Sequence, residues 1–189
     1  MLLLQSAASI SLEGDGTVVP IPMPTADLIS RTAYHRRPAN DADEGFLLNL
    51  YAQERAAELM LAGLDAMQRE MFVQMQFRAR QASYAANYPT ATREIICAED
   101  GTPAGGILVE RATDGMRLID IAVINSKRRQ GFGTEVIRAL QQECHARGWT
   151  LKLQVLKGNP AERLYRRLGF EVEGEDPLRS QMVWSGAKD

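Results

Sequence analysis

The sequence predicts a mixed α/β domain with a central, partly antiparallel sheet flanked by helices. The chain has 189 residues, of which 45% are hydrophobic and 24% charged, a composition typical of a globular domain with its own core. Apolar residues recur with a helical period in some stretches and alternate with polar residues in others. The expected order is strand, two helices, three strands, helix, strand, helix and two strands. This order differs from the regular alternation of a doubly wound fold.

The first expected strand and helix follow one another closely. RTAYHRRPA (31–39) indicates a strand that ends at Pro38. A helix is expected next, with Asn40 or Asp41 as its N-cap, because short polar side chains can accept a hydrogen bond from the first free N–H groups.

A second helical stretch covers residues 53–86. Gly63 is expected to interrupt it and Pro89 to end it. Its apolar stripe consists of Met60, Leu64, Met67, Met71 and Met75. The helical spacing of these methionines favours packing in the core.

Three strands are expected next. EIICAED (94–100) and GGILVERA (105–112) indicate a hairpin, because turn-forming residues join two runs with strand character. Asp114 and Gly115 then form a turn that leads into a third strand, MRLIDIAVI (116–124).

The rest of the chain alternates helices with strands. One helix face is marked by residues three or four apart, namely Phe132, Val136, Ile137, Leu140 and Cys144. Gly148 ends this helix, and TLKLQVL (150–156) alternates as a strand. The next helix is expected to have Asn159 as N-cap and Pro160 at its first position. Two short strands, FEVEG (170–174) and SQMVWS (180–185), complete the fold.

Residues 1–29 differ from the remainder, because they are acidic and contain alternate prolines in VPIPMP (19–24). We interpret them as an N-terminal extension of unknown role and residues 30–189 as one domain. The first Lys or Arg is Arg31, which argues against a secretory signal, and the absence of 18 consecutive apolar residues argues against a membrane span. We therefore expect a cytoplasmic protein without a membrane partner.

Charge and metal-ligating residues restrict the function classes further. The formal net charge is −2, so the chain as a whole does not attract polyanions, and nucleic acid is not an expected partner. The two cysteines and two histidines show no zinc-binding spacing, and no metal is expected.

Positive charge is concentrated in KRRQGFGTE (127–135), directly before a helix. Gly131 and Gly133 allow the backbone to approach a ligand closely and to adopt angles that a Cβ would forbid. The first N–H groups of the helix are unpaired, so the stretch is typical of an anion site. The alternative interpretation is a solvated basic turn. The dinucleotide fingerprint G-x-G-x-x-G fails because Val136 occupies its last position.

These motifs and the order of their elements resemble those of the GNAT acetyltransferase family. Residues 128–133 supply R-x-x-G-x-G between a strand and a helix. A second family motif is matched by Asn159, Leu164, Tyr165, Gly169 and Phe170. The two motifs span about residues 116–170. The elements from about residue 31 onward fit less closely, and residues 1–29 lie outside the resemblance.

The resemblance implies a GNAT-like fold with acetyl-CoA as cosubstrate. The backbone of the third expected strand would pair with the pantetheine arm, which requires the sheet to splay open there. The N–H groups of residues 129–134 would hold the pyrophosphate. The implied cofactor-binding residues are Ile121, Ala122, Val123, Arg128, Arg129, Gln130, Gly131, Phe132, Gly133, Thr134 and Asn159. For Asn159, a cap without cofactor contact is the alternative.

The implied reaction is direct transfer of an acetyl group to a primary amine of a small molecule or peptide. Tyr165 stands where the family often keeps its general acid, although a tyrosine that fills the core would also fit. Asp120 is our candidate base and Glu110 a second one, and each also fits a solvated sheet face. Gln154 occupies a position where family members that acetylate protein N-termini often have a glutamate, which weakens that assignment.

In the family, the first helices usually form the acceptor wall. Gln76, Arg78, Tyr84 and Tyr88 are therefore the polar residues that we expect to line an acceptor pocket. The alternative function is a non-catalytic module of the same fold that binds acyl-CoA or a protein partner. The sequence leaves open whether the protein forms a homodimer.

Overall fold

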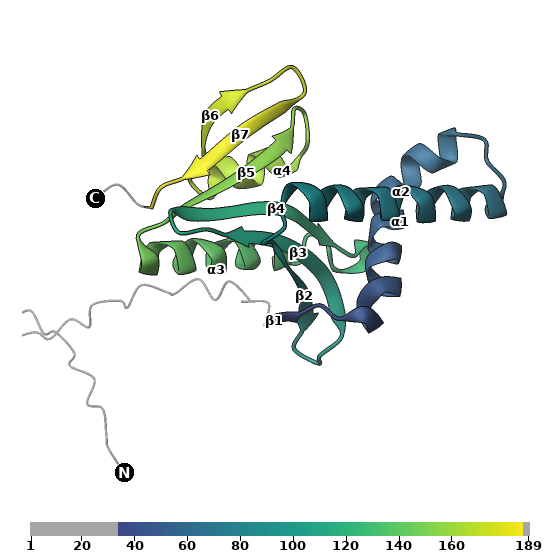
Figure 1. Ribbon diagram of the computed structural model, residues 1–189, viewed down its shortest axis with the longest axis horizontal. Helices are drawn as coiled ribbons and strands as arrows, with labels where there is room; N and C mark the ends of the chain where they lie inside the picture. Colours follow the sequence, from purple (N-terminus) through teal and green to yellow (C-terminus); the bar gives the residue numbers. More distant parts are fainter. Residues whose placement is uncertain (1–33, 187–189) are drawn as a thin grey trace, which may run out of the picture. The chain divides into compact units, whose positions relative to one another are not determined.

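A seven-stranded mixed sheet lies at the centre of the domain (Figure 1). The computed structural model describes residues 34–186, so the expected extension 1–29 lies outside the described part. The strand order is β1-β2-β3-β4-β5-β7-β6, and only β4 and β5 run parallel. The predicted fold class, a partly antiparallel sheet flanked by helices, is confirmed.

The helices and strands follow the expected order. The strands are β1 (Tyr34–Pro38), β2 (Thr92–Ala98), β3 (Pro103–Arg111), β4 (Gly115–Val123), β5 (Thr150–Leu156), β6 (Glu171–Glu175) and β7 (Arg179–Trp184). The helices are α1 (Glu44–Leu61), α2 (Ala66–Asn87), α3 (Phe132–Arg147) and α4 (Ala161–Arg167), with 3-10 turns η1 (Asp41–Asp43) and η2 (Asn125–Lys127).

Local capping explains where several helices begin and end. Asp65 accepts a hydrogen bond from the backbone N–H of Gln68 at 2.8 Å and closes a capping box at the start of α2. Gly148 ends α3 in the left-handed conformation, with φ 66°. Helix α4 begins at Ala161, one residue later than expected, and the side chain of Asn159 accepts from the N–H of Ala161 at 2.9 Å.

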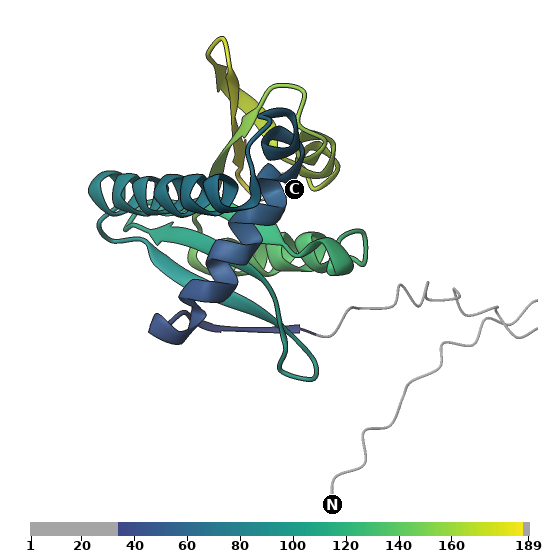
Figure 2. The ribbon, with the colours of Figure 1, turned by 90° about the vertical axis from the view of Figure 1, so that its right-hand side faces the viewer.

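Helices cover both faces of the sheet. Along β2, Ile96 and Ala98 belong to the core cluster that includes the apolar face of α3, whereas Ile95 and Cys97 belong to a second cluster with α1 and α2. Because successive side chains of a strand point to opposite faces, α1 and α2 lie on one face and α3 on the other (Figures 1 and 2). None of the described helices has the length and apolar character needed to cross a bilayer.

The predicted core position of the methionines on α1 and α2 is wrong. Met60, Met67, Met71 and Met75 are 76%, 74%, 66% and 60% exposed. Val73 and Phe77 form the buried side of α2 instead. Helical spacing shows that residues share a face, but it does not show which face of the helix meets the sheet.

Candidate active site

Strands β4 and β5 separate halfway along their length. They pair from Gly115 opposite Thr150 to Leu118 opposite Leu153, and no pairing follows. Beyond this point, Val123 still pairs with Gly105 of β3 and Leu156 with Arg179 of β7. The outer edges of both strands are therefore paired while their inner edges lack a strand partner, so backbone N–H and C=O groups are left free for a ligand.

A β-bulge at Ile119 sets the direction of the neighbouring side chains. Asp120 pairs with Leu108, but Leu118 pairs with Val109, so Ile119 is an extra residue in β4. Leu118 belongs to the core cluster on the α3 face, whereas Asp120 lines a pocket on the α1–α2 face. In a regular strand, residues two apart such as these share a face, so the bulge is what places them on opposite faces.

The loop before α3 has an irregular backbone. Arg129 adopts φ 61°, and it is the only non-glycine residue with a positive φ in the part of the chain that the structure describes. Such a conformation costs roughly 1–2 kcal/mol. Gly131 follows with φ 91° and serves as the N-cap of α3, without a side-chain hydrogen bond. The first N–H groups of α3 consequently have no capping side chain, as an anion site requires.

Only one of the two glycines in this loop has a backbone conformation that favours glycine. Gly131 has the positive φ that was expected, whereas Gly133 does not. A Cβ at Gly133 would meet only the Cδ2 atom of Leu164, at 3.8 Å, an ordinary van der Waals distance. The expectation that both positions require special backbone angles therefore holds for Gly131 alone.

The charged side chains of the loop are mostly exposed. One of them, Arg128, forms a hydrogen bond with the backbone of β4. Its Nε donates to the carbonyl oxygen of Val123 at 2.9 Å. Gln130 donates to the carbonyl oxygen of Ser126 at 2.7 Å. Arg128 therefore links the unpaired end of β4 to the start of α3.

Tyr165 is buried on α4, with its side chain in the core cluster on the α3 face. Its ring centroid lies 5.7 Å from that of Phe170. Burial, and secondarily the negative charge of Asp120, raises the pKa of Tyr165 to about 12. The phenol is therefore protonated at neutral pH, as a proton donor must be.

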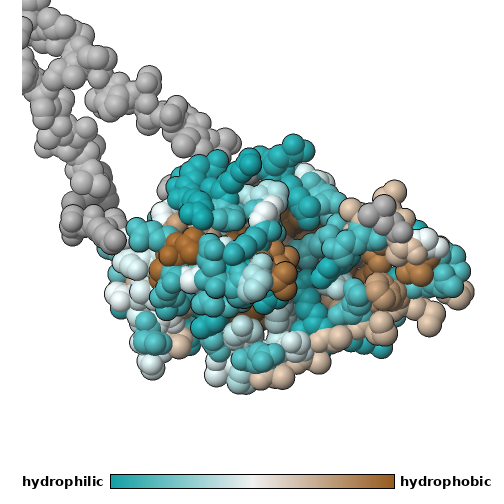
Figure 3. Space-filling model, turned by 90° about the horizontal axis from the view of Figure 1, so that it is seen from above, coloured by the Kyte–Doolittle hydropathy of each residue, from teal (hydrophilic) through white to brown (hydrophobic). Residues whose placement is uncertain are grey.

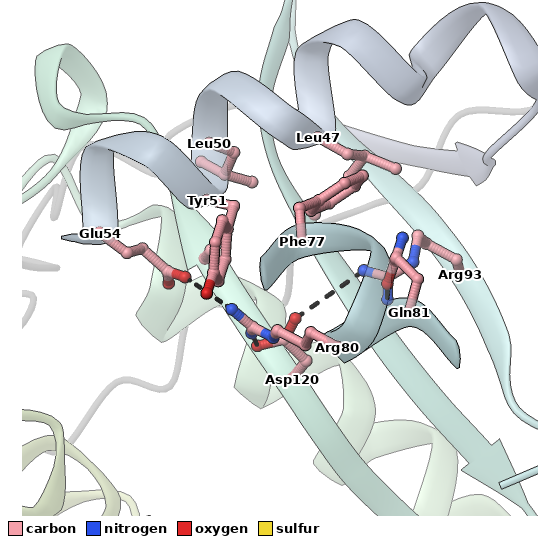
Figure 4. Close-up of a pocket in the computed structure, with 11 residues that line it drawn as sticks. Leu47, Leu50, Tyr51, Glu54, Phe77, Arg80, Gln81, Arg93 and Asp120 are labelled. Carbon is pink, nitrogen blue, oxygen red and sulfur yellow. Dashed lines mark hydrogen bonds and ion pairs between the residues drawn. The ribbon is translucent and has the colours of Figure 1, made fainter. Parts of the chain in front are cut away.

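Asp120 is paired with two arginines (Figure 4). Its Oδ1 lies 2.5 Å from Nη2 of Arg80, and its Oδ2 lies 3.8 Å from Nη1 of Arg93. The first contact is a strong ion pair and the second exceeds hydrogen-bond distance. Oδ2 is therefore the oxygen that is better placed to accept a hydrogen bond from a ligand.

Arg80 connects a cluster of charged and aromatic side chains around Asp120. It donates to Glu54 at 3.1 Å and to the hydroxyl of Tyr84 at 2.9 Å, besides its contact with Asp120. Its guanidinium carbon also lies 5.2 Å from the ring centroid of Tyr51 and 5.3 Å from that of Tyr84. These contacts leave Arg80 little freedom to move.

Partial burial shifts the pKa values of both Glu54 and Arg93. Burial, followed by the charge of Asp120, raises the pKa of Glu54, and burial lowers the pKa of Arg93. Figure 4 shows both at the edge of a pocket beside Tyr51 and Phe77. The pocket has a volume of about 330 Å³, including the part open to solvent.

Sequence reasoning missed Glu54, Arg80 and Arg93. One signal was available for Arg80, since it lies three residues after Phe77 and four before Tyr84, on the same side of α2. A charged residue on the buried side of a helix needs a partner. The partner, Asp120, is 40 residues away and could not be identified from local pattern.

The expected acceptor residues are only partly brought together. Tyr84 belongs to the cluster, and Gln76 accepts a hydrogen bond from the Tyr51 hydroxyl at 3.1 Å. Tyr88 lies instead beside Arg117, whose guanidinium carbon is 6.0 Å from its ring centroid, and Arg78 is exposed. None of the four is among the residues that line the pocket, so the expected lining is wrong, and Tyr84 and Gln76 only contact residues that do line it.

The second candidate base lies outside the cluster. Glu110 pairs in register with Arg117, before the bulge, and accepts a hydrogen bond from Thr90 at 2.9 Å. Of the two candidate carboxylates, only Asp120 lies on the part of β4 that has separated from β5.

Comparison with known proteins finds one matching family model. Residues 91–172 match a family model described as an acetyltransferase (GNAT) domain. No curated protein matches the chain.

Several solved structures share the fold. The PaiA N-acetyltransferase from Thermoplasma acidophilum, solved in complex with coenzyme A, has a TM-score of 0.60 at 14% identity, over 81% of this chain and 99% of that one. A protein from Corynebacterium glutamicum described as histone acetyltransferase HPA2 and related acetyltransferase has a TM-score of 0.60 at 17% identity, over 83% of this chain and 98% of that one. Ard1 from Thermoplasma volcanium has a TM-score of 0.54 at 16% identity, over 82% and 99%. At these identities the likeness is one of fold.

Proposed function

We propose that the protein is an N-acetyltransferase that uses acetyl-CoA, because residues 91–172 match a family model described as an acetyltransferase (GNAT) domain. The acetyl group passes by direct transfer to a primary amine of a small molecule or peptide. The observation that carries the proposal is the continuity between the unpaired edge of β4 and the uncapped start of α3. A ligand that carries both amides and a diphosphate suits these two features together.

Acetyl-CoA supplies the acetyl group as a thioester. The backbone of Ile121, Ala122 and Val123 offers hydrogen bonds to the amides of the pantetheine arm, and the N–H groups of residues 129–134 bind the pyrophosphate. Arg128 now donates to Val123, and exchange of that bond for one with the ligand frees its guanidinium for a phosphate. Asn159, exposed at the start of α4, is the remaining residue of the proposed cofactor site.

Tyr165 acts as the general acid. Its hydroxyl carries a proton throughout the physiological pH range, because its pKa is about 12. A phenol of this pKa releases a proton less readily than one near 10, whereas an ordinary thiol has a pKa near 8.5. Tyr165 therefore first donates a hydrogen bond to the departing sulfur and delivers its proton as the C–S bond breaks.

Asp120 receives the amine. Oδ1 is held by Arg80, so the carboxylate has a fixed orientation, and Oδ2 accepts a hydrogen bond from the attacking N–H group. Loss of the proton to Asp120, directly or through water, completes the transfer. Its pairing with arginines is also compatible with the second candidate function, a module that binds acyl-CoA without turnover.

Two measurements on the purified chain test the proposal. Isothermal titration calorimetry with coenzyme A tests the cofactor, and thiol release from acetyl-CoA with a panel of primary amines tests the reaction. Binding accompanied by amine-dependent thiol release is expected. Binding without release for any amine would favour the non-catalytic module, and the absence of binding would contradict both functions.

A further inference from the structure

Helix α2 is apolar on the side that faces away from the sheet. Its buried side contains Val73 and Phe77, and its opposite side contains Met67, Met71 and Met75. The same exposed side continues toward the C-terminal end of the helix as Arg78, Ala79 and Ala82, so it is largely apolar with one charge. A surface helix of a monomeric protein normally has charged or polar residues in these positions. The pattern of α2 is that of a helix covered on both sides.

The exposed methionines gather at one end of the domain. We call Met60, Met67, Met71 and Met75 the methionine surface. The tip of the α1–α2 hairpin extends beyond the sheet in Figure 1, and several hydrophobic residues lie among hydrophilic ones at this end in Figure 3. Of the seven large hydrophobic residues exposed within the described chain, five lie on α1 and α2. Such a concentration is typical of an interaction surface, and methionine adapts well to a partner.

We propose that this surface binds a second copy of the chain, with the two α2 helices antiparallel. Charges on α2 favour a twofold arrangement. Glu70 and Arg78 stand four residues before and four residues after Gln74, along one side of the helix. In an antiparallel pair centred at Gln74, Glu70 of each copy lies level with Arg78 of the other, which gives two ion pairs by symmetry.

The apolar residues fit the same register. Met71 and Met75 flank the centre and meet their counterparts from the second copy. Met67 lies level with residue 81 of the second copy, so a long side chain packs beside the small Ala82. This alternation of large and small residues lets two helices approach closely.

The size of the surface limits the strength of the dimer. Helix α2 from Met67 to Ala82 is about 22 Å long at 1.5 Å per residue. A single helix pair of this length buries less than the roughly 800 Å² per partner of a standard interface. The dimer is therefore expected to dissociate on dilution, so its detection requires a concentration series.

Sedimentation velocity of the full chain, from about 1 to about 100 μM, tests the proposal. A monomer–dimer equilibrium is expected. Met71→Glu and Met75→Glu should shift the midpoint at least about tenfold toward higher concentration, because each buries a charge in the interface. Leu178→Glu is the matched control, since Leu178 is 70% exposed on a distant turn, and it should leave the equilibrium unchanged.

A charge exchange tests the register. Glu70→Arg and Arg78→Glu should each weaken the dimer, and the double variant should restore it, because the ion pairs form again with reversed sign. A monomer at every concentration, or a dimer that both methionine variants leave intact, would overturn the proposal. Binding of the monomer to phosphatidylcholine–phosphatidylglycerol vesicles through the methionine surface would overturn it in favour of a lipid partner. None of these readouts depends on acetyl-CoA.

Discussion

Tyr165 and Asp120 belong to opposite faces of the sheet, yet the carboxylate of Asp120 contributes to the raised pKa of the Tyr165 hydroxyl. Asp120 lies on the part of β4 that has separated from β5. The proposed acid and the proposed amine-binding carboxylate are therefore close enough to interact electrostatically, although their side chains belong to different faces. The opening between β4 and β5 begins where their pairing ends, at Leu118 and Leu153.

Tyr165→Phe should lower the rate of acetyl transfer by about 10²-fold or more, because the departing sulfur loses its proton donor. Affinity for coenzyme A should remain close to that of the wild type, since the ring and its packing are kept. Steady-state kinetics together with calorimetry separate the two effects. An equal loss of binding would show that the tyrosine supports the cofactor site and not the chemical step.

Stability should fall at alkaline pH because of Tyr165. Its pKa is about 12 in the folded chain and near 10 in the unfolded chain, so only the unfolded chain loses this proton between these values. The protonated phenol therefore makes its full contribution to the free energy of unfolding below pH 10. This contribution is about 1.4 kcal/mol smaller at pH 11 and is lost as pH rises through 12. Urea unfolding from pH 9 to 11 measures it. In Tyr165→Phe this part of the slope should disappear.

Asp120→Asn should lower the pKa of Tyr165, because a negative charge that opposes ionisation of the phenol is removed. Burial is the larger cause and persists, so the pKa should stay above 10. Ultraviolet titration of tyrosinate, compared with the same titration of Tyr165→Phe, identifies the shifted group. An unchanged titration would mean that the carboxylate and the phenol do not interact.

Gly131→Ala and Gly133→Ala should behave differently. Alanine at 131 must adopt φ 91°, which costs about 1 kcal/mol of stability and distorts the start of α3. Coenzyme A should therefore bind more weakly. Alanine at 133 meets only Leu164 and is a better helix former, so folding and binding should both be preserved. Thermal unfolding and calorimetry on the pair provide the comparison, with Gly133→Ala as the control.

Arg80→Met should destabilise the fold by about 2 kcal/mol, because it leaves Asp120 and Glu54 without their shared partner. Adding Glu54→Gln should recover part of the loss, since one of the two uncompensated charges is then removed. Urea unfolding of the wild type and of the single and double variants measures this coupling. Strictly additive effects would contradict a shared network.

Much of the fold could be predicted because its signals are local. Turn residues, alternation and the apolar face of α3 identify the elements in their correct order. The irregular turn at Gly131 could be predicted because two glycines and the charges of 127–129 stand directly before an apolar helix face. The face of α2 could not be assigned, since Met67 and Phe77 both have apolar side chains and only contact with the sheet distinguishes them.

Long-range pairing explains what else was missed. The bulge at Ile119 depends on how β4 aligns with β3, and nothing in MRLIDIAVI marks an extra residue. The ion pair between Arg80 and Asp120 joins a helix to a strand 40 residues later. Such contacts follow from the assembled fold, so sequence reasoning could propose Asp120 but not its partners.

The extra residue in β4 makes the strand tolerant of a deletion at one position. Loss of Ile119 would give an uninterrupted ladder in which Leu118 still pairs with Val109 and Asp120 with Leu108, so both side chains would keep their faces. Regular pairing that kept Ile119 would instead place Ile119 opposite Leu108 and turn Asp120 into the apolar packing against α3. Deletion of Ile119 should therefore be tolerated, as should changes of length in the surface turn at 112–114, a pattern that a library of single-codon deletions would make visible.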